Sequence, residues 1–139
     1  MITTEIDTSD FHSSENCYQC HSDHVDEWNR SMHSYSMRDP VFFLGWYSER
    51  ENHENTGERF CIQCHSPVAY LTGYKLDQYN TVQDLQNDPE LSKSIKEGVT
   101  CTVCHSVNGI IGSPDLIANT KPPFLKSPNF PKSILVPSG

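Results

Sequence analysis

The sequence predicts a mainly α-helical chain with extensive coil and little or no sheet. No stretch has a convincing strand pattern, whereas several short stretches carry apolar residues at helical spacing. Apolar residues make up only 35% of the 139 residues. Five of the nine prolines fall within residues 122–137, where they exclude regular helix. The length suits a single domain.

A Cys-x-x-Cys-His motif occurs three times and uses all six cysteines of the chain. Two thiols one helical turn apart can each form a thioether with one vinyl group of a porphyrin, and the histidine that follows can ligate the iron. The pattern therefore predicts three covalently bound haem c groups. The attaching residues would be Cys17, Cys20, Cys61, Cys64, Cys101 and Cys104, and the proximal ligands would be His21, His65 and His105.

Other uses of paired cysteines match this pattern less well. A structural zinc site needs four ligands, and three pairs with adjacent histidines do not divide into tetrahedral sites. A thioredoxin-like Cys-x-x-Cys pair would begin a helix between two strands, and no such strand pattern is present. A disulfide framework would not require a histidine after each cysteine pair. With 139 residues shared among three sites, each haem has about 46 residues, so porphyrin faces would replace part of the apolar core. We expect a small haem-packed multihaem cytochrome c.

The first half of the chain predicts an arm, a helix and a loop. Residues 1–14 are acidic and rich in Ser and Thr, and would form a mobile or draped N-terminal arm. The first motif should continue as a helix to about residue 35, because Val25, Trp28 and Met32 recur on one face. The aromatic run at residues 41–47 would pack against haem, and residues 48–58 would form a polar loop.

The second half predicts two helix starts and a different C-terminal segment. Thr81 and Asp84 have the spacing of a capping box. Asp88 followed by Pro89 would begin a helix that ends at Gly98. We therefore expect a three-haem domain over residues 15–106, followed by a proline-rich apolar strap or linker over residues 107–139.

Four further histidines are available as distal ligands: His12, His24, His33 and His53. Three distal positions would leave one of them spare, and iron held by two imidazoles carries electrons without an open position for substrate. His33 would lie on the same helix as His21, too far along it to return to its own haem, so it should reach a neighbouring one. Which of the other three is spare stays open. Met37 is a rival ligand, whereas Met32 looks like helix packing.

Net charge and hydropathy limit the partners and the location. The formal charge is −8, so the basic surface of a nucleic-acid-binding protein is absent, and a basic patch on a redox partner protein is a suitable docking surface. Residues 116–139 carry three lysines and no acid, which would suit contact between copies. No stretch is long and apolar enough to span a membrane. Because haem is normally attached covalently outside the cytoplasm, we expect a periplasmic or extracellular location. Either a signal peptide was removed before this numbering begins, or the chain is a piece of a longer cytochrome.

Two parts of the sequence together resemble a known family. The first motif followed by Trp28, Ser31 and His33, and the run Gly98-Val99-Thr100 before Cys101, resemble the tetrahaem cytochromes of the nitrifier hydroxylamine-oxidation type. The resemblance covers roughly residues 15–106. It implies a haem-packed electron carrier in which His33 ligates the haem of His105. The fourth motif of that family, and the histidine after its third motif, are missing here.

A looser similarity is to the filament-forming extracellular multihaem cytochromes, in which a neighbouring subunit can donate a histidine. His12 on the arm and the proline-rich tail would suit that arrangement. The sequence thus favours electron transfer through three haems that are mostly or wholly bis-histidine ligated, and not an enzyme. Two alternatives stay open. One is a protomer of a conductive filament, and the other is a small oxidoreductase with one five-coordinate haem that acts on nitrogen or oxygen compounds.

Overall fold

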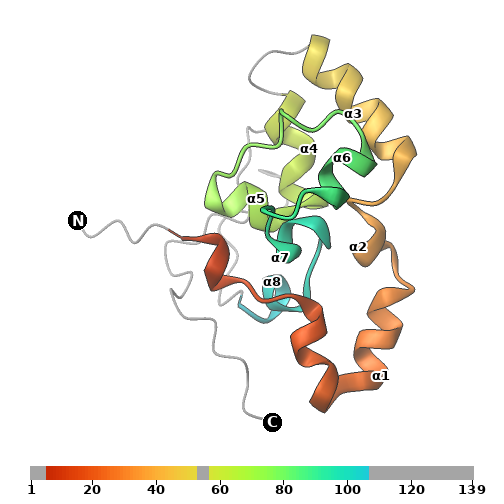
Figure 1. Ribbon diagram of the computed structural model, residues 1–139, viewed down its shortest axis with the longest axis vertical. Coiled ribbons are helices and arrows are strands. Elements are labelled where there is room, and N and C mark those ends of the chain that lie inside the picture. The colour runs from red at the N-terminus through yellow and green to blue at the C-terminus, as the bar shows by residue number, and fades with distance from the viewer. Residues whose placement is uncertain (1–5, 53–56, 107–139) are drawn as a thin grey trace, which may run out of the picture.

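The computed structural model describes residues 6–52 and 57–106, and within these residues every regular element is a helix (Figure 1). Two short 3-10 helices, η1 (Thr8–Asp10) and η2 (Ser14–Cys17), precede eight α-helices. These are α1 (Tyr18–Asn29), α2 (Met32–Tyr35), α3 (Pro40–Asn52), α4 (Gly57–His65), α5 (Pro67–Thr72), α6 (Val82–Asn87), α7 (Lys93–Lys96) and α8 (Cys101–His105). The predicted mainly α fold is therefore confirmed. No helix in the described part is long and apolar enough to cross a membrane.

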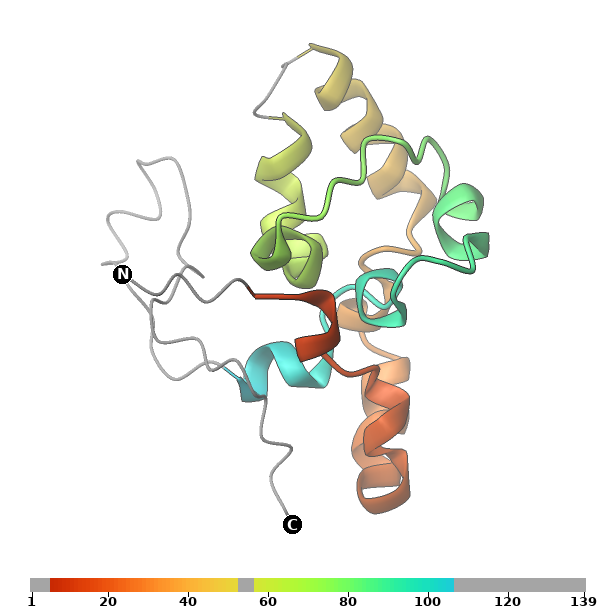
Figure 2. The same ribbon diagram turned by 60° about the vertical axis from the view of Figure 1, so that its left-hand side comes forward.

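The helices are arranged in two outer groups with a central layer between them. Helices α3 and α4 pack against each other at one end, and α1 with α2 extends toward the other (Figure 1). Helices α5, α7 and α8 lie between these ends. The segment that carries η1 and η2 runs between α5 and α8, so the start of the described chain is part of the central layer (Figure 2).

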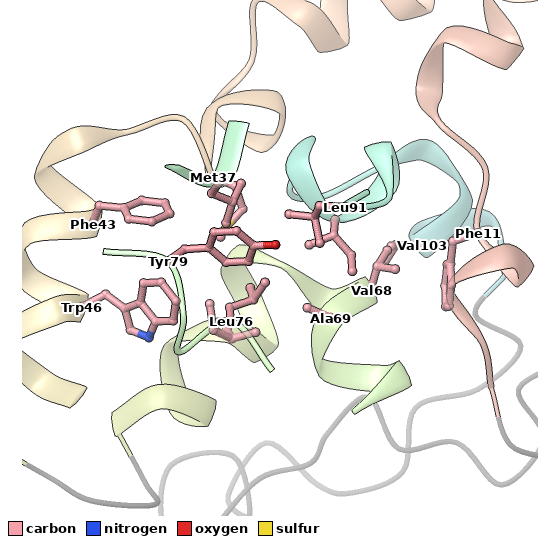
Figure 3. Close-up of a cluster of buried hydrophobic side chains, with 13 residues drawn as sticks. Phe11, Met37, Phe43, Trp46, Val68, Ala69, Leu76, Tyr79, Leu91 and Val103 are labelled. Carbon is pink, nitrogen blue, oxygen red and sulfur yellow. The ribbon is translucent and has the colours of Figure 1, made fainter. Parts of the chain in front are cut away.

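The apolar core lies in this central layer and reaches up between α3 and α4 (Figure 3). Its members come from helices α3 to α8 and from the segments between elements: Phe11, Met37, Phe43, Trp46, Ile62, Val68, Ala69, Leu76, Tyr79, Leu85, Leu91, Ile95 and Val103. Two of them, Ile62 and Val103, are middle residues of the second and third motifs. The core therefore holds the helices that carry these motifs in place.

The predicted continuous helix from the first motif to residue 35 is wrong. Helix α1 ends at Asn29, and His33 lies on the separate short helix α2. Serine hydroxyls end the first helix, because Ser31 Oγ donates to Trp28 O at 2.7 Å and Ser34 Oγ donates to Asn29 O at 3.0 Å.

The three residues proposed to form one apolar face of that helix separate in the structure. Val25 is buried, as expected. Trp28 is half-buried, and its indole N–H donates to Val99 O at 2.7 Å. Met32 is 71% exposed, so the prediction that it packs within the helix is wrong.

The predicted loop over residues 48–58 is also wrong where the structure describes it, because α3 continues to Asn52. Pro40 occupies the first position of α3, and the Asp39 carboxylate accepts from the backbone N–H of Val41 at 2.9 Å. The aromatic run is thus part of this helix. Its Phe43 and Trp46 are buried in the protein core, while Val41 and Leu44 are exposed.

Between the second and third motifs, one predicted helix start is correct and one is wrong. Thr81 and Asp84 form the expected capping box at the start of α6. Asp88, however, ends α6, and α7 begins five residues later at Lys93. The Asp88 carboxylate accepts from Tyr79 Oη at 2.5 Å and from the Glu90 N–H at 2.8 Å, which holds it in a turn. As predicted, the helical stretch stops just before Gly98.

The structure describes most of the predicted N-terminal arm but not the predicted C-terminal strap. Of the predicted N-terminal arm, residues 6–14 lie on the protein, with Phe11 in the core and Ser14 fully buried. The predicted proline-rich strap at residues 107–139 lies outside the described residues.

Candidate haem-binding sites

The three motifs share a local conformation. Each lies on a short helix that stops or breaks at its histidine. Helix α4 ends at His65 and α8 ends at His105, while α1 has a break at His21, where φ is −130° and ψ is 44°. In each case the chain turns away directly after the proposed proximal ligand.

The two cysteines of each motif differ in exposure, and Cys61 packs partly against the apolar core. In every motif the first cysteine is half-buried and the second is exposed, and all six are free thiols. In the second and third motifs the two middle residues are buried instead: Ile62 and Gln63, and Thr102 and Val103. These two helices therefore bury their middle residues in the protein and keep both cysteines more accessible, as a thioether-bound porphyrin requires.

Exposed apolar side chains lie near the first two candidate sites. Tyr18 follows Cys17 directly, Phe60 precedes Cys61 directly, and Met32 and Tyr35 lie on the helix that carries His33. The remaining large exposed apolar residues, Val41, Leu44 and Tyr47, are on α3, which packs against the helix of the second motif. Exposed apolar side chains on the helices of the first and second motifs, and on the helices beside them, suit a flat apolar macrocycle. The residues present therefore fit haem c.

Burial keeps the attaching thiols protonated. Removal from water raises the pKa of Cys17, Cys61, Cys64 and Cys104 above the ordinary thiol range. For Cys17 the neighbouring Cys101 and the carboxylate of Glu97 raise the pKa further. These thiols are thus poor thiolates at neutral pH, unlike those of a redox-active Cys-x-x-Cys pair.

Gly98, three residues before the third motif, lies against the end of the second motif and against α2. This residue has φ +82°, and a Cβ placed there would lie 1.9 Å from Ser36 Oγ, 3.0 Å from His33 O and 3.1 Å from His65 O. Ser36 Oγ itself donates to His33 O at 3.0 Å and to His65 O at 2.8 Å. Only a glycine allows this close approach, because the two carbonyl groups belong to the backbone and cannot rotate away.

His65 is oriented by a backbone carbonyl. Its Nδ1 lies 3.2 Å from Ser36 O, which can only accept a hydrogen bond. Nδ1 therefore carries the hydrogen, and Nε2 is left as the nitrogen that can ligate a metal.

The first and third motifs are neighbours in space. Cys17 and Cys101 lie close enough together for Cys101 to raise the pKa of the Cys17 thiol. The Cys101 N–H donates to Ser14 Oγ at 3.3 Å, and the buried Glu97 carboxylate accepts from Ser13 Oγ at 2.5 Å and from the Ser14 N–H at 2.9 Å. The residues that lead into the first motif are thus fastened to those that lead into the third.

The four candidate distal histidines are spread differently. His33 O accepts from the Val99 N–H at 3.2 Å, which places α2 beside the approach to the third motif. His12 O accepts from Thr102 Oγ1 at 3.2 Å, so His12 lies next to the third motif as well. His24 is exposed on α1, 3.6 Å from Glu27. His53 lies outside the described residues. The rival ligand Met37 is fully buried in the apolar core.

The sequence missed several residues that organise the sites. Ser36 and Gly98 hold the segments of the second and third motifs together, and Glu97 fastens the N-terminal segment. Gly98 carried a signal, since it was part of the family resemblance, but its packing role did not follow from it. No sequence pattern indicated the roles of Ser36 and Glu97, because the residues that they contact are distant in sequence.

Comparison with known proteins decides the family. A sequence profile described as cytochrome c554 and c-prime matches residues 16–106, which is more than half of the chain. The chain belongs to this family. It is a multihaem c-type cytochrome, and its family supports electron transfer through covalently bound haem. The finer resemblance to tetrahaem cytochromes of one type stays a prediction.

A solved structure supports the same assignment. The fold is similar to that of a penta-heme cytochrome c552 from Thermochromatium tepidum, with a TM-score of 0.54 and 28% sequence identity over 74% of this chain. This chain spans 26% of the length of that cytochrome. No curated protein sequence matches the chain.

Proposed function

We propose that this cytochrome transfers electrons through three covalently bound haems, one at each motif. The observation that carries the proposal is that the second motif meets the approach to the third at Gly98, while the first is fastened to the third through Ser14 and Glu97. Haem supplies a one-electron couple when bound, and the chain determines where each haem is held and how its iron is ligated.

The chain would hold each haem from both sides. His21, His65 and His105 would be the proximal ligands. His33 would be the distal ligand of the haem on His105, which agrees with the hydrogen bond that fixes α2 beside Val99. His12, His24 and His53 supply candidates for the two remaining distal positions, with one to spare. Complete bis-histidine ligation would leave no open position for a substrate, so we infer an electron carrier and not an enzyme.

The contacts between motifs favour electron exchange within the molecule. The neighbouring positions of Cys17 and Cys101 would bring the first and third haem sites close to each other. Ser36 connects the backbone of His33 to the backbone and imidazole of His65, which brings the second site close to the proposed distal ligand of the third. A chain of neighbouring sites is the arrangement that a relay needs.

We further propose that the protein works in the periplasm or outside the cell. Its acidic character, with a formal charge of −8, suits a redox partner that presents a basic patch. Contact with other copies, as in a conductive filament, is a second way to pass electrons between molecules.

Two measurements on the haem-loaded protein test the proposal. A pyridine haemochrome assay should give three haems per chain. A spectroelectrochemical titration should show that the haems are reduced and reoxidised reversibly, with low-spin spectra throughout. Fewer than three haems, or haems that cannot be reduced reversibly, would contradict it. Carbon monoxide should not bind without displacing a ligand, and ready binding would instead support the five-coordinate oxidoreductase.

A further inference from the structure

Two groups contact the imidazole of His65 at different places. The ring of Phe42 lies flat against it, with 3.6 Å between ring centroids and 3° between planes. Ser36 O meets its Nδ1 edge at 3.2 Å. A hydrogen bond at one edge and a flat stack on one face together remove the rotation that either contact alone would permit.

The stack on His65 is anchored in the core. Phe42 is parallel to Trp46, at 6.0 Å between centroids and 7° between planes, and Trp46 is only 1% exposed. On Trp46 lies the guanidinium of Arg50, 4.5 Å from the ring centroid. Arg50 Nη1 donates to the carbonyl groups of Leu76 and Tyr79 at 3.3 and 3.0 Å. The position of Phe42 is therefore set by the fold itself and not by the haem.

The other two proximal histidines differ from His65. The nearest ring to His21 is that of His24, at 6.1 Å and tilted by 32°. For His105, no stacked ring is found among residues 6–52 and 57–106. A preset imidazole plane is thus a property of the second site in the described part of the chain.

We propose that Phe42 is a positioning residue that fixes the plane of the His65 imidazole on the second haem. This inference rests on the proposed function, since it requires His65 to ligate a haem. The plane of an axial imidazole determines how the iron d orbitals split, and the Nδ1 hydrogen bond adjusts how strongly the ligand donates. Phe42 would therefore control the electronic state of this haem without touching the iron.

The test compares two neighbouring phenylalanines in the haem-loaded protein. Phe42→Leu removes the stacked ring and keeps an apolar side chain. Phe43→Leu is the matched control, because Phe43 is buried and packs edge-on against Phe42 and Trp46. In low-temperature EPR, Phe42→Leu should shift or broaden one of the haem signals and leave the others unchanged. Phe43→Leu should have a clearly smaller effect, because the ring stacked on His65 remains.

A conservative variant covers the case in which Phe42→Leu loses the second haem. Phe42→Tyr keeps the ring and should retain the wild-type signal. Wild-type spectra from Phe42→Leu, or equal changes in Phe42→Leu and Phe43→Leu, would overturn the positioning role, as would a shifted signal from a fully loaded Phe42→Tyr. Absence of haem from residues 61–65 of the wild-type protein would instead overturn the proposed function, and peptide mass analysis distinguishes the two.

Discussion

At the scale of single residues, one glycine determines whether three chain segments can meet. Gly98 adopts a left-handed conformation within contact distance of the carbonyl groups of His33 and His65. Any side chain there would separate the segments that hold the proposed ligands. The packing of the sites therefore depends more on this small residue than on any apolar side chain near it.

Substitution of the glycines tests this point directly. Gly98→Ala should lower the free energy of unfolding by about 2–5 kcal/mol, because strain and overlap add together. Gly73→Ala is the matched control, since Gly73 has φ +71° but nothing within 4 Å of an added Cβ. It should cost only about 1–2 kcal/mol. Urea unfolding measures both. Equal effects of the two substitutions would show that close packing at Gly98 contributes nothing.

A second prediction at this scale concerns His33. His33→Ala should convert one haem to the high-spin state while all three remain covalently attached, because the cysteines are untouched. Optical spectra and EPR report the spin state, and Asp26→Ala, at an exposed position of α1, provides the comparison. Unchanged spectra of His33→Ala would remove His33 from the ligand set.

At the scale of elements, the sequence predicted those features that depend on neighbouring residues. The capping box at Thr81 and the stop before Gly98 are local, and both were correct. The break before His33 depends on serine hydroxyls that bind carbonyl groups of the preceding helix, and helical periodicity does not report this competition. Likewise, Asp88 resembles a helix start, but its bond to Tyr79 holds it in a turn.

The haem-attachment motif could be recognised in the sequence because its residues are neighbours along the chain. Cysteines one turn apart and an adjacent histidine define the motif in any fold. The contacts of Ser36 and Phe42 with His65 depend on how α2, α3 and α4 pack, and this packing is a tertiary result. The sequence therefore predicted where haem would attach but not how the proposed ligand is oriented.

The Tyr79–Asp88 pair predicts how stability depends on pH. The hydrogen bond from Tyr79, followed by that from the Glu90 N–H, lowers the pKa of Asp88 below its usual 3.8. The folded state thus binds this proton less readily than the unfolded chain. The contribution of Asp88 is present above pH 3.8 and is lost as the pH falls through its lower folded pKa.

Urea midpoints measured between neutral and acid pH test this contribution. Tyr79→Phe should reduce the acid slope of stability relative to the wild type, and Asp88→Asn should remove the contribution of this carboxyl group. The same acid slope in all three proteins would contradict the prediction. At the alkaline end, burial and the bond to Asp88 raise the pKa of Tyr79, so the wild type should lose stability as the pH rises beyond the usual tyrosine range.

At the scale of the whole molecule, the described residues combine a small apolar core with cysteine motifs that are partly exposed. The core of thirteen side chains fixes the helices in the centre, while large apolar residues such as Val41 and Phe60 stay exposed near the motifs. This division is what a protein stabilised partly by its cofactors requires. Electron transfer through three haems requires haem to be attached at each of the three motifs.

Mass analysis of tryptic peptides tests that claim most directly. Cleavage after lysine and arginine separates the motifs into peptides of residues 1–30, 60–75 and 97–126, if the bond before Pro122 resists cleavage. Each peptide should carry the added mass of one haem and absorb in the Soret region. If any of the three peptides has only the mass of its amino acids, the three-haem account is contradicted.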